Sequence, residues 1–340
     1  MVLRELPGFP HVPELPSRGP WFDMVGRGCA VLLDLPAAHS AGRWSFVRGV
    51  GIGTDLRKAR SGLRDDTEQF ADLVNRRHVL GAHADEDLMA GVKLQFCGPV
   101  TLAASVELPN GQAALSDGRA RADIAASLAE GLRQHIMDVA GWFPDGLPLV
   151  VQVDEPAITG ALQGIVPTVS GMGHHAALAT DEVEAQLANV VQSVAGTSHE
   201  VVLHCCAEDP PVRVLAAAGA HALSVDLTLL ELASEAADHL GEWLQGGNKL
   251  FGGVSVSDPS ASVDDMRSSE DSFDPGQVSG VRQLADLGRL MGEEWLRAQA
   301  VQQLTLTPPC GLADTTIDQA APQYRRLRTL QRDFVSGNLP

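Results

Sequence analysis

The stretch LVVQVDEPA at residues 149–157 contains the clearest strand signal in the chain and ends in two acids before a proline. Its first five residues are mostly apolar or β-branched, which is typical of a buried strand. Pro156 lacks a backbone N–H and biases the residue before it towards an extended conformation, so it ends the strand. We therefore expect Asp154 at the carboxyl end of a buried strand.

Other short apolar runs alternate with longer amphipathic segments along the rest of the chain. We predict strands at 92–96, 149–153, 201–204, 222–226, 250–256 and 303–307, with two weaker ones at 30–35 and 47–52. The spacing predicts helices at 124–140, 182–194, 212–218, 230–244, 278–298 and 318–334. Strands that alternate with helices pair in parallel, which leaves a doubly wound sheet or a barrel.

Two observations favour the barrel. The sequence has neither GxGxxG after an early strand nor GxxxxGK[ST], the usual signatures of nucleotide-binding doubly wound folds. Reactive side chains also recur where predicted strands end, and the carboxyl ends of barrel strands meet at one mouth. We predict an α/β fold, a (β/α)8 TIM barrel in a single domain over residues 1–340 with an N-terminal arm, and a flexible acidic loop at 257–276.

The amino-acid composition disfavours nucleic acids and membranes as partners of this chain. The chain has 43 acidic and 25 basic residues, a formal charge of −18, which disfavours binding to a phosphate backbone. Its apolar runs are shorter than the roughly 18 to 20 residues of a membrane helix, and its proline-rich start lacks a signal-peptide core. We expect a cytoplasmic protein with no nucleic-acid or membrane partner.

The strongest chemical signal is LHCC at residues 203–206. His204 and Cys206 are two apart, so in an extended segment they face the same way, whereas Cys205 faces into packing. Imidazole and thiolate both suit zinc, although small cysteines at a strand end can also be plain core filler. Asp226 and Cys310 end later strands, so we predict a metal site of His204, Cys206, Asp226 and Cys310.

The acid pair and the turn FCGPVT at 96–101 give weaker signals. Asp154 is expected to enter the mouth and Glu155 to face the opposite side. The acids could instead complement a helix N-terminus or pair with an arginine, and FCGPVT, with Thr101 as a mouth candidate, could be ordinary turn chemistry.

Taken in order, GPVT, DEP, HxC and CGL resemble the C-terminal catalytic barrel of cobalamin-independent methionine synthase. PGFPHVPEL near the start and WFDMVGR after it are similar to further segments of that family, so the resemblance covers most of the chain. The chain is similar to a short stand-alone form, within a wider superfamily that includes uroporphyrinogen decarboxylase.

The resemblance implies that His204, Cys206 and Cys310 bind Zn2+, with Asp226 where the family usually has glutamate, and that Asp154 holds the amino group of homocysteine. Three features depart from the family. No histidine stands in the segment 253–259, Ser105 or a neighbour replaces the tryptophan that flanks the folate, and Gly8 or Phe9 stands at the family's serine. His174 and His175 lie in a glycine-rich loop and are either solvent-exposed or a replacement for the missing histidine.

From these residues we predict a zinc-dependent methyltransferase that activates homocysteine or a similar small thiol for S-methylation, as in methionine biosynthesis. It would resemble 5-methyltetrahydropteroyltriglutamate-homocysteine S-methyltransferase, with its methyl donor unassigned among folate, a corrinoid protein and other carriers. One alternative is a decarboxylase-like lyase without zinc, in which Arg18 and Arg27 hold substrate carboxylates. Another is a non-catalytic barrel that keeps its metal.

Overall fold

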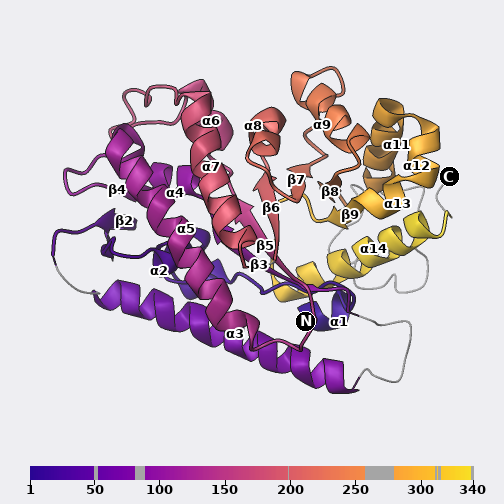
Figure 1. Cartoon of the computed structure of the whole chain (residues 1–340), viewed down its shortest axis with the longest axis horizontal. Coiled ribbons are helices and arrows are strands. Elements are labelled where there is room, and N and C mark those ends of the chain that lie inside the picture. Colours follow the sequence, from indigo (N-terminus) through magenta and orange to yellow (C-terminus); the bar gives the residue numbers. More distant parts are fainter. Residues whose placement is uncertain are drawn as a thin grey trace. The chain divides into compact units, whose positions relative to one another are not determined.

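The computed structural model describes residues 1–49, 53–80, 89–197, 199–256, 279–310, 312 and 315–337. It divides into two compact units: one comprises residues 1–6, 206–213 and 222–340, and the other residues 7–205 and 214–221. Figure 1 labels the helices and strands along the chain. Within the described residues, every helix is too short or too polar to span a lipid bilayer.

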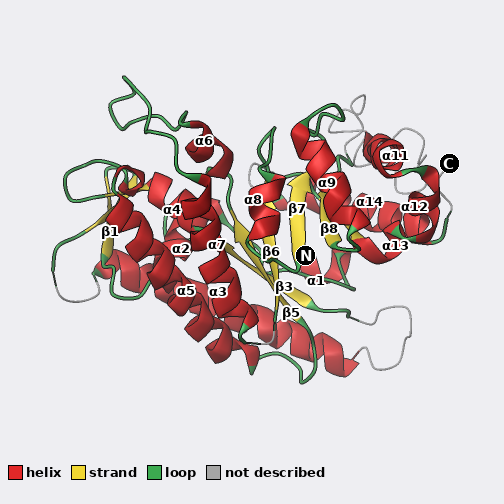
Figure 2. Cartoon of the chain, turned by 45° about the horizontal axis from the view of Figure 1, so that its top comes forward, coloured by secondary structure: helices red, strands yellow, loops and turns green. Residues whose placement is uncertain are grey.

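The larger unit is built on three parallel strands, which neighbour one another in the order β3, β5, β6 (Figure 2). Their bounds are β3 Val92–Cys97, β5 Leu149–Asp154 and β6 Glu200–Cys205. Residues of β5 are buried along its whole length, as its apolar run predicts. Residues 8–12 run beside β3, because Lys93 donates its backbone N–H to Pro10 and accepts one from Val12.

Helices cover this unit. The longest is α3 Thr54–Leu80, and α5 Gly118–Ala140 packs along α7 Thr180–Ala195 (Figure 1). Asp117 begins α5 by accepting the backbone N–H groups of Arg119 and Ala120. The remaining helices of this part are η1 Pro16–Arg18, α2 Met24–Val31, α4 Pro99–Ser105, η3 Ala114–Ser116 and α6 Ile158–Gln163, and α8 Val212–Ala217 follows β6.

A second, small sheet lies in the same unit. The strands β1 Ala37–Ser40 and β2 Arg43–Phe46 form an antiparallel hairpin, and β2 pairs in parallel with β4 Val106–Glu107. The two residues at the hairpin tip, Ala41 and Gly42, both have positive φ, at 49° and 81°, as this tight turn requires.

The smaller unit holds three more parallel strands in the order β7, β8, β9, with bounds Ala222–Asp226, Lys249–Gly253 and Leu304–Thr307. Its helices are α1 Val2–Glu5, α9 Glu235–Gln245, α11 Ser279–Met291, α12 Glu293–Ala298, α13 Ala300–Gln303 and α14 Ile317–Val335. A capping box of Thr316 and Gln319 begins α14. Val2 of α1 packs on Ala320 and Tyr324 of α14.

The alternation of helices with parallel strands is of the TIM-barrel kind, but the predicted closed ring of eight strands is not found in the described residues. The predicted strand at 30–35 is wrong, because its first residues end α2. Asp23 begins that helix by accepting the N–H of Gly26. Of the predicted strand at 47–52, residues 47–49 are irregular and 50–52 lie outside the described residues.

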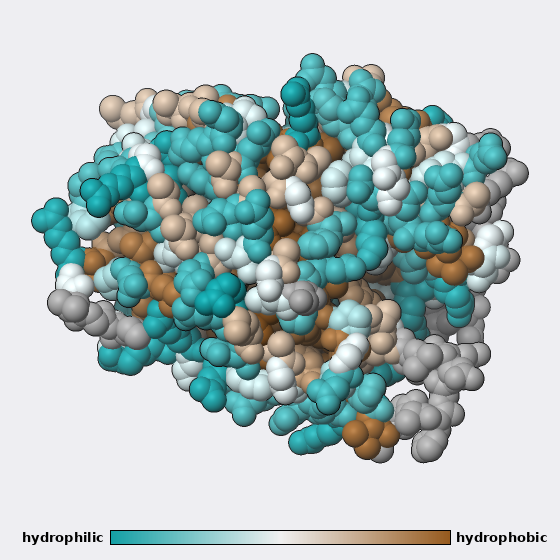
Figure 3. All heavy atoms as spheres, in the orientation of Figure 1, coloured by the Kyte–Doolittle hydropathy of each residue, from teal (hydrophilic) through white to brown (hydrophobic). Residues whose placement is uncertain are grey.

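The bounds of the other predicted strands are confirmed to within three residues. The predicted helix 278–298 is divided at Gly292, whose φ of 89° separates α11 from α12. The predicted acidic loop at 257–276 lies outside the described residues. On the face in Figure 3, hydrophilic residues are spread widely.

Candidate metal centre

The carboxyl ends of β5 and β6 bring two of the predicted site residues together. In the parallel pairing of these strands, Asp154 is the register partner of His204. Register partners on adjacent strands lie about 5 Å apart and point to the same face of the sheet. The side chains of Asp154 and His204 are therefore neighbours on one face at the end of the sheet where these strands finish.

Three of the four predicted metal ligands form a group. One ligand atom from each of His204, Cys206 and Cys310 lies within 4.8 Å of the others. The Sγ atoms of Cys206 and Cys310 are 3.1 Å apart, and Cys310 follows β9 after a Pro-Pro pair. Cys205 is fully buried, as expected for the residue that faces away from the group.

The donor types in this group are those that zinc prefers. One imidazole nitrogen and two thiols form the nitrogen and sulfur set of many zinc sites, whereas magnesium and calcium prefer oxygen. His204 and Cys206 are half-buried and Cys310 is exposed, so a metal bound there would be reachable by a small ligand. The donor set therefore fits zinc with at least one further ligand.

The fourth predicted ligand, Asp226, is the last residue of β7 and is buried, but it is not a member of the three-residue group. Its Oδ1 accepts the backbone N–H of Thr228 at 2.9 Å and the hydroxyl of Thr228 at 2.6 Å. This carboxylate therefore shapes the turn after β7, and its role as a ligand stays a prediction.

Asp154 is held by a buried amide. Gln152, two residues earlier on β5, donates from Nε2 to Oδ1 of Asp154 at 2.7 Å. Lys93 of β3 donates in turn from Nζ to Oε1 of Gln152 at 2.7 Å. Both Gln152 and Asp154 are 8% exposed, so this chain of contacts is largely shielded from bulk water.

Unlike its neighbour Asp154, Glu155 contacts the start of a helix. It is fully buried and accepts the backbone N–H groups of Val100 and Thr101 and the hydroxyl of Thr101, at 2.9, 2.8 and 2.6 Å. These donors lie in the first turn of α4, so Glu155 satisfies the start of that helix. Gly98 is required here, because a Cβ on it would lie 2.4 Å from Oε1 of Glu155.

Glu155 and Thr101 thus follow the alternative interpretation of both motifs, in which the acid complements a helix N-terminus and FCGPVT is turn chemistry. Thr101 donates to Glu155 and accepts the backbone N–H of Ala157 at 3.2 Å, which joins the two segments. Burial raises the pKa of Glu155 to about 7, against the hydrogen bonds from Thr101 and Val100, which lower it.

The arginines proposed for a carboxylate clamp are paired with the chain's own acids. Arg18 donates from Nη1 to both carboxylate oxygens of Asp66 at 2.7 and 2.8 Å, and its guanidinium lies over the ring of Phe22. Arg27 is 3% exposed, with Nε 3.4 Å from Oε1 of Glu14.

The two loop histidines differ in exposure. His174 is exposed, whereas His175 is 8% exposed and donates its backbone N–H to Val166. The Nε2 atom of His175 is buried without a hydrogen-bond partner. A catalytic role for either histidine stays a prediction.

Sequence reasoning missed Lys93, Gln152 and Glu14, which surround Asp154. Burial raises the pKa of Glu14 to about 7, while Arg27 lowers it, and burial lowers the pKa of Lys93, while Asp154 raises it. A signal was available: Lys93 and Gln152 are polar residues inside otherwise apolar strands, and the chain has only three lysines. Such residues in a buried strand need partners.

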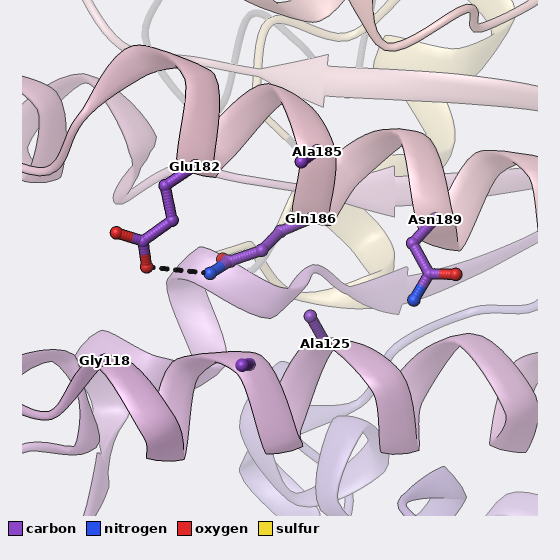
Figure 4. A pocket seen from close by; sticks show the side chains of 7 residues that line it. Gly118, Ala125, Glu182, Ala185, Gln186 and Asn189 are labelled. Carbon is purple, nitrogen blue, oxygen red and sulfur yellow. Dashed lines mark hydrogen bonds between the residues drawn. The ribbon is translucent and has the colours of Figure 1, made fainter.

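Two surface hollows are lined by residues outside the predicted site. A cavity of about 430 Å³ opens between α5 and α7, lined by small residues with Glu182 and Gln186, which hydrogen-bond to each other (Figure 4). A second, of about 450 Å³, includes Leu149 and Glu200, at the amino ends of β5 and β6. Neither includes a predicted site residue.

Comparison with known proteins gives the family. The profile of the cobalamin-independent synthase catalytic domain matches residues 65–332. The chain belongs to this family. The match includes the cluster of His204, Cys206 and Cys310 and the pair of Asp154 and His204, so both lie in the part that the family shares.

Among solved structures, the chain is similar to a B12-independent methionine synthase from Shewanella sp. W3-18-1, solved in complex with selenomethionine. The two are 14% identical, with a TM-score of 0.48, over 87% of this chain and 71% of that one. A search of curated proteins found no match. The family assignment of this cobalamin-independent synthase homologue therefore comes from the profile match.

Proposed function

We propose that the chain is a zinc-dependent methyltransferase that methylates the sulfur of homocysteine or of a closely related amino thiol, in the manner of a methionine synthase. The observation that carries the proposal is the register pairing of Asp154 with His204, next to the Cys206–Cys310 pair. Membership of the cobalamin-independent synthase family supports it.

His204, Cys206 and Cys310 would hold the metal, with Asp226 as a proposed fourth ligand. When bound, zinc favours the thiolate form of a coordinated thiol at neutral pH. A protein site that already supplies two cysteine sulfurs suits such alkyl-transfer chemistry better than hydrolysis, for which zinc sites more often use histidines and carboxylates.

Asp154 would give the site its preference for an amino thiol. Its carboxylate lies beside His204 on the same face, so a ligand whose sulfur is near the metal ligands can place an α-ammonium against it. A charge-assisted hydrogen bond of this kind contributes about 1.5–3 kcal/mol. The second reactant would be a methyl donor that approaches from the exposed side, where Cys310 lies.

The test is X-ray absorption at the zinc edge of the zinc-loaded protein, with homocysteine and with its des-amino analogue, 4-mercaptobutanoate. We expect homocysteine to add one sulfur to the metal's neighbours and to bind more tightly than the analogue, by about 1.5–3 kcal/mol. Asp154→Asn should remove most of this preference.

Glu182→Gln is the matched control, because it also replaces an acid by an amide but disturbs only the contacts of Glu182 with Arg121 and Gln186. It should bind both thiols like the unchanged protein. If neither thiol adds a sulfur ligand, the proposal is wrong, and a barrel that keeps its metal without catalysis becomes the better account.

A further inference from the structure

One face of β3 and β5 carries a set of polar side chains. Gln95 is the register partner of Gln152, and Cys97 is that of Asp154, so Lys93, Gln95, Gln152 and Asp154 share a face. Of these, Lys93, Gln152 and Asp154 form a continuous chain of two hydrogen bonds, each 2.7 Å long.

The chemistry of the two ends fixes the amide in the middle. An ammonium group can only donate and a carboxylate can only accept. Gln152 must therefore turn its oxygen to Lys93 and its NH2 group to Asp154, which is the orientation observed. The amide has no second orientation that keeps both bonds.

This arrangement also decides which oxygen of Asp154 is used. The Gln152 amide contacts Oδ1, and in the described part of the chain no other side chain donates to this carboxylate. The guanidinium of the buried Arg27 contacts Glu14 and the backbone oxygen of Gln95. Oδ2 is thus left to accept from a ligand.

Resting on the proposed function, we propose that Lys93 and Gln152 are positioning residues for substrate recognition. They hold Oδ1 of Asp154 so that Oδ2 meets the α-ammonium of the thiol substrate, and they thereby set the preference for amino thiols. Neither residue touches the substrate. The positive charge of Lys93 polarises the Gln152 amide and so strengthens the hydrogen bond that keeps the Asp154 carboxylate in one orientation.

Gln95 offers a matched control. It is 7% exposed, on the same face, and in register with Gln152. Its Nε2 donates to the backbone oxygen of Val12, not to Asp154. Gln95→Leu therefore removes a buried amide of the same size from the neighbouring strand and leaves the contact to Asp154 in place.

The experiment is calorimetric titration of the zinc-loaded protein with homocysteine and with 4-mercaptobutanoate, for the unchanged protein, Gln152→Leu, Lys93→Met and Gln95→Leu. The readout is the ratio of the two dissociation constants. We expect the unchanged protein to prefer homocysteine by about tenfold or more, and Gln152→Leu to reduce that ratio to about twofold.

In Gln152→Leu, the affinity for 4-mercaptobutanoate and the zinc content should stay unchanged, because only the ammonium contact is lost. Lys93→Met should reduce the ratio less, and Gln95→Leu should leave it unchanged. If Gln152→Leu does not fold and Lys93→Met does, the ratio of dissociation constants measured for Lys93→Met tests the inference. Crystal structures of the variants without substrate should show a rotated Asp154 carboxylate in Gln152→Leu, a smaller rotation in Lys93→Met and none in Gln95→Leu.

If Asp154→Asn abolishes the preference while Gln152→Leu and Lys93→Met keep it, the inference is overturned and the proposed function stands. If Gln95→Leu reduces the ratio as much as Gln152→Leu, the effect is general loosening of the sheet, which also overturns it. If the unchanged protein binds neither thiol, the proposed function fails and the inference fails with it.

Discussion

Asp154 and Glu155 are adjacent acids with opposite surroundings. Asp154 ends β5 beside His204, with one carboxylate oxygen held by Gln152. Glu155 is fully buried under the first turn of α4, where three donors meet its carboxylate. Ligand binding is the role proposed for the Asp154–His204 strand ends, whereas the contacts of Glu155 with α4 stabilise the fold.

The difference follows from strand geometry. Side chains alternate between faces, so one step along the chain moves a carboxylate from the face with His204 to the face with α4. The carboxylate then either keeps the capacity to accept a further hydrogen bond, as in Asp154, or is used by two backbone N–H groups and a hydroxyl of α4, as in Glu155. Each acid of such a pair therefore needs its own prediction. The variants below test whether a residue has a ligand-binding role or a structural role.

The largest effect is expected for Glu155→Ala. The change leaves the N–H groups of Val100 and Thr101 buried without an acceptor, so the free energy of unfolding should fall by about 3–5 kcal/mol. Urea denaturation followed by circular dichroism measures it. Asp154→Asn, which alters a single side-chain hydrogen bond, should cost about 1 kcal/mol; equal losses for the two variants would erase the comparison.

Cys310→Ser tests whether Cys310 is a zinc ligand. Removing one of the two sulfurs should weaken zinc binding by at least about 100-fold, because a hydroxyl is a poor ligand for this metal. Competition with a chromophoric chelator gives the affinity. The control is Cys205→Ser, a buried cysteine next to Cys206 that lies outside the group, and it should keep its zinc. Full zinc occupancy in Cys310→Ser would contradict the ligand set.

Asp226 has features of both roles: it lies at the end of a strand, as a ligand would, and it also accepts the backbone N–H of Thr228 in the turn. If it is a ligand, Asp226→Glu should keep zinc, whereas Asp226→Ala should weaken zinc binding about tenfold or more. Asp226→Asn keeps an acceptor for Thr228 but loses the charge, so it separates the two roles. Equal zinc affinity in all three variants would show that Asp226 has a structural role and is not a ligand.

The last expected effect is a pH dependence of stability. Burial raises the pKa of Glu155 from 4.5 to about 7, so between these values the folded state binds more protons than the unfolded state. The contribution of Glu155 to stability is therefore largest below pH 4.5 and is lost as the pH rises through 7.

The stability difference between the unchanged protein and Glu155→Gln should accordingly shrink from pH 5 to pH 8, by about 2–3 kcal/mol. Urea denaturation at a series of pH values measures it. Taking the difference cancels the opposing contributions of His11 and His135, whose pKa values burial lowers to about 4. A difference that grows with pH would show that the hydrogen bonds from Thr101 outweigh burial.

The sequence predicted well wherever a signal was local. Apolar runs marked six of the parallel strands, and strand-end positions marked Asp154, His204 and Cys206. It failed at 30–35, where an apolar run ends α2, because burial alone does not distinguish a short helix from a strand. It also missed α3, whose buried positions such as Leu56, Leu63 and Phe70 are separated by many charged residues.

The sequence by itself determined the order of the parallel strands along the chain, the residue types at their carboxyl ends and the family, because each depends on residues close together or on motif order. Only the tertiary structure decided the partners of the buried polar side chains: Glu155 reaches Thr101 across 54 positions, and Lys93 reaches Gln152 across 59. Such contacts depend on register and crossover geometry, which a linear pattern of apolar and polar residues does not encode.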